Sequence, residues 1–170
     1  MVEAAIDAGL RWLHVLAGIV WIGHNYAGVV LVPRFRAYDP AQDQAEASLT
    51  SSYMGRQQRE HAVFRYSSVV TWVCGIALLW RQDRLVEVLT MNGHDAPIGL
   101  AVWIGTVMML NVWLVMWPHQ KKVLGFVPAP VAERVRCSRI TFLSARVNTM
   151  LSIPLVLLMV AAPHTPALFV

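Results

Sequence analysis

Apolar residues form four long runs along the chain, at about residues 9–33, 62–80, 97–118 and 141–162. Each run is nearly free of charged side chains and is close to the length of a helix that crosses a bilayer, at a rise of about 1.5 Å per residue. The second run is the shortest and carries Arg65 in its first turn. The pattern therefore predicts one all-α domain over residues 1–170, an integral membrane four-helix bundle.

Composition and charge indicate how such a bundle would sit. Of the 170 residues, 56% are hydrophobic and 14% are charged, which is too apolar for a typical soluble domain. The basic residues gather around the first and third connections, whereas Arg81 and Arg84 in the second have acidic neighbours. Cytoplasmic loops are enriched in lysine and arginine. We therefore expect a cytoplasmic loop at 34–60, with a surface helix from about Pro40, both termini on the outer side, a lipid bilayer as partner and no nucleic acid.

The first run carries polar residues that a lipid-facing helix does not need. On a helix at 100° per residue, His14, Gly18, Trp21 and Asn25 fall within about 40° of one direction. His24 lies roughly 80° from that direction. A polar face notched by glycine should look into a protein interior. We expect this face to hold the functional chemistry.

The third and fourth runs add two local expectations. Ser144, Asn148 and Ser152 repeat every four residues, so they form a polar stripe that should pack on another helix. Pro118 closes the third run, and we expect the helix to stop there because proline disfavours a helix interior.

Four histidines are candidate cofactor ligands, because two histidines on facing helices commonly hold haem b in a bundle. His14 lies about one turn inside the outer face and His164 lies at that face, so these two can be level. The same pair is the candidate metal site. His24 lies near mid-membrane, and a second site with His61 requires the second helix to enter the membrane more deeply than the run 62–80 indicates. His14 and His24 are roughly 15 Å apart along one helix, so they cannot share one iron.

Each of these assignments has an ordinary alternative. His14 is otherwise a hydrogen-bonded packing residue, and His164 a solvated interfacial one. Arg65 and Glu60 are ordinary polar neighbours for His61. Under a haem interpretation Arg65 or Arg146 could instead pair with a propionate. Copper is a less expected cofactor, because the methionines show no ligand spacing. The two cysteines form no CxxC motif and are expected to be small core residues.

Several stretches resemble a known family. The membrane domain of the bacterial membrane-bound urate oxidase family is similar to RWLHVLAGIVWIGHNY, TVMMLNVWLVMWPHQKKVLG and SARVNTMLSIPLVLLMVAAPH. More distantly, LHVLAGIVW followed by LVPRF resembles the HemJ-type protoporphyrinogen oxidases and the copper-resistance D-type membrane proteins. The resemblance covers most of the chain except the first two loops. It implies a redox protein of the bacterial inner membrane, with His14 and His164 at positions that the family motif contains.

The resemblance and the histidines together predict an inner-membrane haem b protein that transfers electrons, alone or as a subunit of a larger redox complex. In the urate oxidase family a cytochrome c domain follows the membrane domain. This sequence has no CxxCH motif, so we expect other membrane redox subunits or a cytochrome c to accept the electrons. Two alternatives remain open. One is a cofactor-free accessory subunit that binds neighbouring subunits through its polar stripes, and the other is a small-molecule oxidase of the urate oxidase type, an oxidoreductase with a separate electron acceptor.

Overall fold

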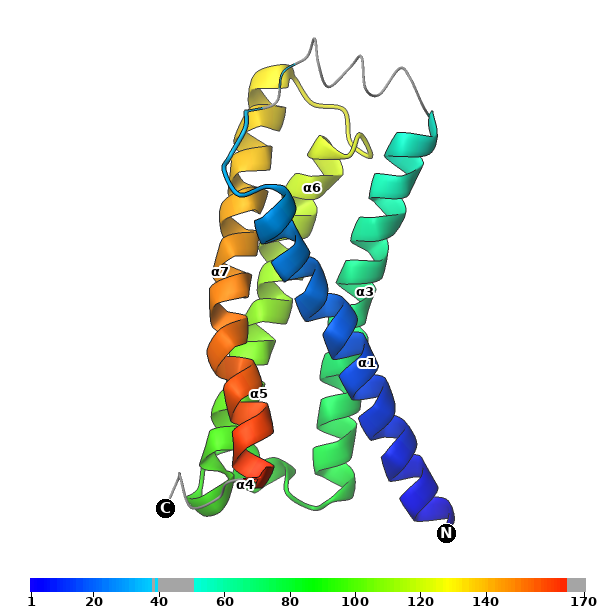
Figure 1. The fold of residues 1–170 in the computed structure, drawn as a ribbon, viewed down its shortest axis with the longest axis vertical. Helices are drawn as coiled ribbons and strands as arrows, with labels where there is room; N and C mark the ends of the chain where they lie inside the picture. The colour runs from blue at the N-terminus through cyan, green and yellow to red at the C-terminus, as the bar shows by residue number, and fades with distance from the viewer. Residues whose placement is uncertain (38, 40–50, 165–170) are drawn as a thin grey trace.

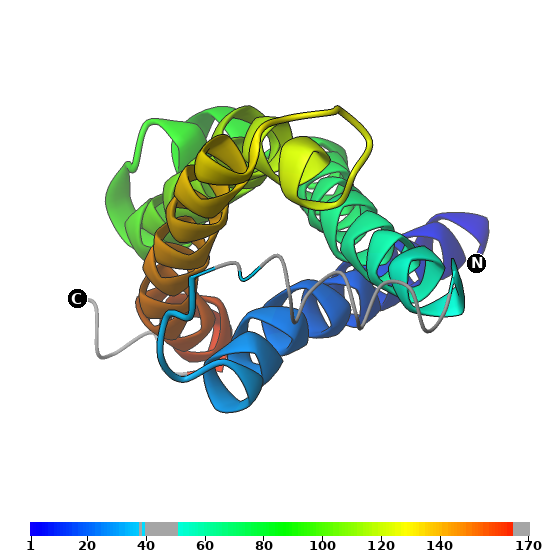
Figure 2. The same ribbon diagram turned by 90° about the horizontal axis from the view of Figure 1, so that it is seen from above.

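The computed structural model describes residues 1–37, 39 and 51–164, and every regular element over those residues is a helix. Figure 1 shows α1 (Val2–Leu31) running diagonally from the foot of α3 (Ser51–Arg81) towards the upper half of α7 (Val131–His164). Seen from above in Figure 2, α1, α3 and α7 lie around a common centre, together with the helical segment that precedes α7. α1 packs on both α3 and α7 and closes one side of the bundle.

Four helical segments in the described part of the chain are long and apolar enough to cross a membrane: Val2–Leu31, Gln58–Arg81, Gly93–Val123 and Val131–Ala162. They confirm the all-α class and the four predicted runs. α3 begins at Ser51 rather than near 62, and α7 begins at Val131 rather than near 141. Hydropathy finds the apolar part of a helix and misses the polar turns that extend it. The predicted loop 34–60 is therefore too long, and the surface helix expected from about Pro40 begins outside the described residues.

The third long apolar segment is one continuous helical path with a π-helical stretch inside it. α5 (Ala96–Leu110), the π segment Asn111–Met116 and α6 (Trp117–Val123) follow one another without a break. Pro118 has no N–H to donate, and its ring crowds the carbonyl one turn earlier, which disfavours a regular α-helix. The wider π turn directly before Pro118 accommodates it. The expectation that the helix stops at Pro118 was therefore wrong.

The two ends of the bundle differ in charge. The terminal end holds the start of α1, α4 (Leu85–Leu89) and the end of α7, all at the bottom of Figure 1. The basic end lies opposite, where the chain leaves α1 and α6, and it is defined by Arg34, Arg36, Lys121, Lys122 and Arg134. This separation of charge follows the grouping of basic residues along the sequence.

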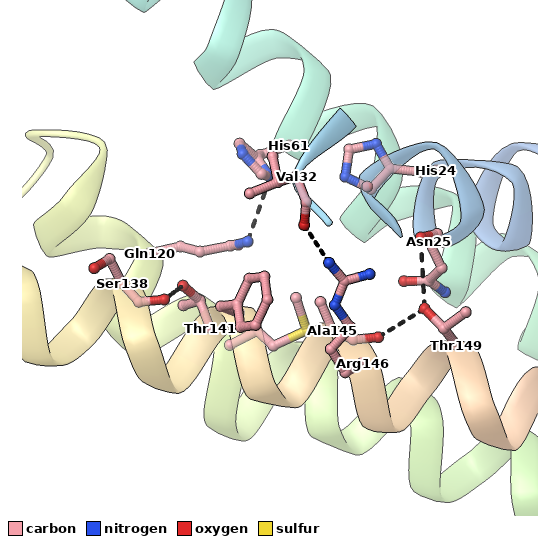
Figure 3. Close-up of a pocket in the computed structure, with 13 residues that line it drawn as sticks. His24, Asn25, Val32, His61, Gln120, Ser138, Thr141, Ala145, Arg146 and Thr149 are labelled. Carbon is pink, nitrogen blue, oxygen red and sulfur yellow. Dashed lines mark hydrogen bonds between the residues drawn. The ribbon is translucent and has the colours of Figure 1, made fainter. Parts of the chain in front are cut away.

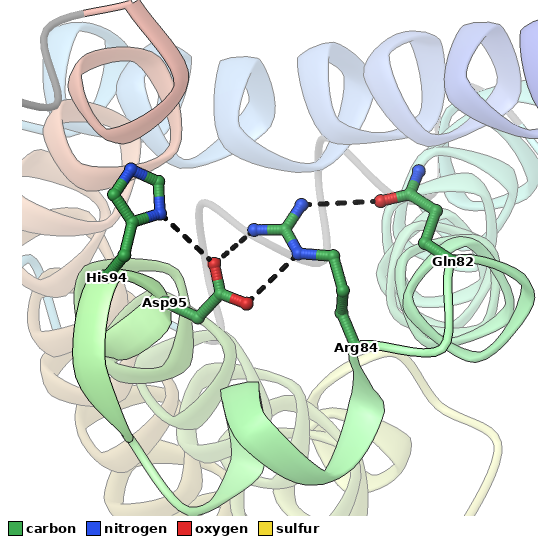
Figure 4. Close-up of polar contacts among 4 residues, drawn as sticks. All are labelled: Gln82, Arg84, His94 and Asp95. Atoms are coloured by element: carbon green, nitrogen blue, oxygen red, sulfur yellow. Dashed lines mark hydrogen bonds and ion pairs between the residues drawn. The ribbon is translucent and has the colours of Figure 1, made fainter.

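Ion pairs link the helices and the turn at the terminal end. Arg81 near the end of α3 pairs with Glu3 and Asp7 of α1. Figure 4 shows Arg84, whose Nε donates to Asp95 Oδ2 at 3.0 Å and whose Nη2 donates to Asp95 Oδ1. The hydrogen bonds to the Asp95 carboxylate raise the pKa of the Arg84 guanidinium above its ordinary value, because they favour the charged form. The turn between α3 and α5 is thereby fixed.

The polar stripe of α7 packs on the third segment, as predicted. Asn111 Nδ2 donates to Asn148 Oδ1 at 2.8 Å and to the Ser144 carbonyl at 3.1 Å. Asn148 Nδ2 donates to the Met108 carbonyl at 3.2 Å, and Asn148 and Ser152 are both 0% exposed. The stripe is therefore used inside this chain. The expectation that Asn148 and Ser152 would bind a neighbouring subunit does not agree with their burial.

Candidate functional site

The polar face of α1 looks into the bundle, as its spacing predicts. Trp21 is 2% exposed and Asn25 is 4% exposed. Gly18 lies against α3, where a Cβ would be 3.7 Å from Thr71 Cγ2. The interior between α1, α3 and α7 is therefore where a functional site is to be sought.

His14 is held by α3. Its Nδ1 lies 2.8 Å from the Thr71 carbonyl oxygen, which can only accept, so Nδ1 carries the proton. Gly75 makes room for the ring, because a Cβ there would be 2.9 Å from His14 Cε1. Among the described residues no hydrogen-bond partner reaches Nε2. This fixed tautomer is the one that metal-binding histidines use, and it serves equally in a histidine that only joins two helices.

His24 and His61 are brought together near the basic end. Their ring centres are 5.6 Å apart at 73°, and the His24 ring also stacks on Phe64 with centres 4.4 Å apart. A carboxylate oxygen of Glu60 lies 3.5 Å from His24 Nδ1, and the amide of Gln120 lies 3.3 Å from His61 Nδ1. From the sequence, this pair could meet only if the second helix entered the membrane more deeply than its apolar run indicates. α3 begins at Ser51, almost three turns before His61, so His61 lies within the helix and not at its start.

A cavity of about 190 Å³ opens beside these two rings (Figure 3). α1, α3, α6 and α7 all contribute to its lining. Arg146 of α7 brings a positive charge to this cavity, donates to the Val32 carbonyl and lies 4.6 Å from the Phe142 ring centre. The other polar lining side chains are His24, Asn25, His61, Gln120, Ser138, Thr141 and Thr149.

Asn25 is the residue of this cavity whose side-chain amide lacks hydrogen-bond partners. Neither Nδ2 nor Oδ1 of its buried amide has a hydrogen-bond partner within the described structure, and Trp21 Nε1, one turn away, also lacks one. In proteins the great majority of buried polar groups are paired, and a water, an ion or a ligand is one explanation for an exception. The amide offers both a donor and an acceptor to such a molecule. Its position beside His24 was visible in the sequence, but its lack of a partner was not.

The structure does not bring His14 and His164 together. His14 contacts α3 at Thr71, which lies ten residues, about 15 Å, from the end of that helix at Arg81. His164 is exposed and is the last residue of α7, at the same end of the bundle. α1 begins at Val2 at this same end, so His14 lies more than three turns away from it. The two residues therefore lie at different depths in the bundle.

Cysteine and acidic residues are the other usual metal ligands besides histidine. Cys74 and Cys137 are buried and free, as expected of small core residues. Among the described residues, no group of three or more histidine, cysteine, aspartate or glutamate side chains is placed to hold a metal ion. The chain matches no protein-family model, no curated protein and no solved structure.

Proposed function

We propose that the chain is a multi-pass protein of the bacterial inner membrane that binds haem b and transfers electrons. The four apolar helices support the membrane location. The basic end would face the cytoplasm, because lysine and arginine are retained on that side, and the terminal end would face outwards. In this orientation His24, His61 and the cavity lie in the inner half of the bilayer.

The observation that carries the haem assignment is the His24–His61 pair beside an unsatisfied Asn25. The two imidazoles stand on facing helices, and each has its Nδ1 next to a polar group. This leaves the two Nε2 atoms as the atoms that would hold haem, with the neighbouring groups to orient the rings. Bound haem supplies one-electron transfer chemistry at this position.

The two imidazoles fit haem b as ligands, but the space between and beside them is small. The two rings touch, and the cavity of about 190 Å³ is smaller than the roughly 300–1,000 Å³ of sites that bury drug-sized ligands. Loading therefore requires the His24 and His61 rings to separate. Arg146 would pair with a propionate, because a guanidinium binds a carboxylate through two parallel hydrogen bonds. His14, with its free Nε2, is a separate candidate ligand.

The visible absorption spectrum of the purified protein tests this function. Protein made in cells supplied with haem should show a Soret band and, after reduction, a sharp α band. Asn25→Leu should weaken or shift these bands, because it removes the unpaired amide beside the pair. A colourless preparation without iron contradicts the proposal.

A cofactor-free accessory subunit is the second candidate, favoured by the poor coverage of α1. Only 6% of the most apolar window of α1 is buried, against 33% for the segment in α3. Another membrane subunit would cover the exposed apolar face of α1. Ile19, which is exposed, tests it: Ile19→Trp should release the chain from a larger complex in mild detergent. If the wild-type chain migrates alone, this candidate fails.

An enzyme of the urate oxidase type is the third candidate. In that case the cavity would hold the substrate, and the electrons would leave to another polypeptide. Turnover of urate or a porphyrinogen by the purified chain with an added electron acceptor would support it, and no turnover by haem-loaded protein would exclude these two substrates.

A further inference from the structure

Arg65 of α3 is buried among aromatic rings and has no acidic partner among the described residues. Its guanidinium carbon lies 3.4 Å from the centre of the Trp117 ring, 5.2 Å from Trp113 and 5.0 Å from Tyr66. Arg65 is 7% exposed, and neither Nε nor Nη1 has a hydrogen-bond partner among the described residues. Cation–π contacts offset part of the cost of burying the charge. They supply no acceptor for these N–H groups, so the guanidinium is left unsatisfied.

A third unpaired donor lies beside this arginine. Trp113 Nε1 is buried and also has no partner within the described structure. The indole and the guanidinium can only donate, so this set contains donors and a positive charge but no acceptor. A group of this kind selects an oxyanion, because charged oxygen atoms form the strongest bonds with such donors.

The surroundings indicate where the anion comes from. Trp113 lies in the π segment, and such segments often mark functional sites. Lys121 Nζ lies 5.8 Å from the Trp117 ring centre, and so adds a second cation one turn nearer the basic end. On α3, Tyr66, Val70 and Val73 share one exposed face that runs from Arg65 towards the terminal end. This apolar strip would accept acyl chains below a phosphate held by the cations.

We propose that Arg65, Trp113 and Lys121 bind the phosphate of an anionic phospholipid in the cytoplasmic leaflet. The site rests on the membrane orientation proposed above and is independent of haem. Basic pockets between spanning helices on the cytoplasmic side are typical sites for anionic head groups. Free phosphate offers the same oxygen atoms but leaves the apolar strip of α3 uncovered, so we assign the site to the lipid.

Thermal stability of the delipidated protein measures this binding. Phosphatidylglycerol should raise the Tm in a saturable way, whereas phosphatidylcholine with the same chains and inorganic phosphate should not. Trp113→Phe keeps the ring and removes one donor, so it should weaken the apparent affinity about tenfold. Arg65→Gln should abolish the response.

Two matched variants serve as controls. Trp72 is another tryptophan of the bundle, but its Nε1 already donates to Thr106 Oγ1 at 2.9 Å. Trp72→Phe should therefore lower the Tm and leave the response to phosphatidylglycerol intact. Lys121→Gln should weaken that response, whereas Lys122→Gln should not, because Lys122 pairs with Glu133.

Three results would overturn the proposal. One is equal stabilisation by phosphatidylglycerol and phosphatidylcholine, and another is a response that Trp113→Phe and Lys121→Gln leave unchanged. The third is saturable stabilisation by inorganic phosphate without lipid, which would assign the site to a free anion. If Arg65→Gln does not fold, Trp113→Phe and Lys121→Gln still decide the outcome.

Discussion

His14 of α1 lies directly over Gly75 of α3, where a Cβ would stand 2.9 Å from His14 Cε1 and 3.1 Å from Nδ1. The same ring donates from Nδ1 to the Thr71 carbonyl at 2.8 Å. The absence of a side chain at position 75 lets the ring reach that carbonyl. His14 and Gly75 therefore set how closely α1 and α3 approach.

Gly75→Ala should displace the His14 ring and break its hydrogen bond to Thr71. We expect a loss of about 1–3 kcal/mol in the free energy of unfolding, as for other overpacked sites. Reversible unfolding in mixed micelles measures it. Gly18→Ala is the matched control, because a Cβ at Gly18 would make only an ordinary 3.7 Å contact with Thr71.

The cause of this loss is tested by a double variant. With His14→Ala already present, Gly75→Ala should cost much less, because the ring that it displaces is gone. If the two losses simply add, the contact between residues 14 and 75 does not explain the effect.

Those parts of the site could be predicted from the sequence that show as polar residues repeating at helical spacing within one helix. The interior face through Trp21 and Asn25 follows from helical spacing alone, and so does the stripe through Asn148. The contact between His24 and His61 lies in a part of α3 that follows ten helical residues, 51–60, which are mostly polar and so give no hydropathy signal. The mismatch in depth between His14 and His164 likewise required the true helix ends.

Two further features could not be predicted because they depend on contacts between helices. The π segment carries the third helix past Pro118, where proline alone predicts an end. The stacking of Arg65 on Trp117 requires two residues 52 positions apart to lie at one level. A single sequence holds no signal for such a pairing.

Asn148→Leu should destabilise the packing of α7 on the third segment. The change removes the hydrogen bonds with Asn111 Nδ2 and with the Met108 carbonyl. We expect a loss of roughly 1–3 kcal/mol, because Asn111 Nδ2 loses its side-chain acceptor in the interior. Unfolding in mixed micelles measures the loss, with the exposed Met150→Leu as control. Unchanged stability would mean that the network contributes little.

Membrane orientation can be tested with single cysteines in a chain whose native Cys74 and Cys137 have been replaced. Asn92 is exposed at the terminal end and Phe126 is exposed near the basic end. In intact spheroplasts a membrane-impermeant maleimide should label Asn92→Cys, and it should label Phe126→Cys only after lysis. The reverse pattern would invert the proposed topology.

The haem content of purified, folded variants tests the central claim most directly. We expect His24→Ala and His61→Ala each to lose the haem or to change its ligation, seen as a shifted Soret band. His14→Ala should lower stability and keep the spectrum, and His119→Ala should change neither, because His119 Nδ1 bonds to the Val115 carbonyl of its own helix. If His24→Ala and His61→Ala retain the wild-type spectrum while His14→Ala loses it, the cofactor is not held by the His24–His61 pair.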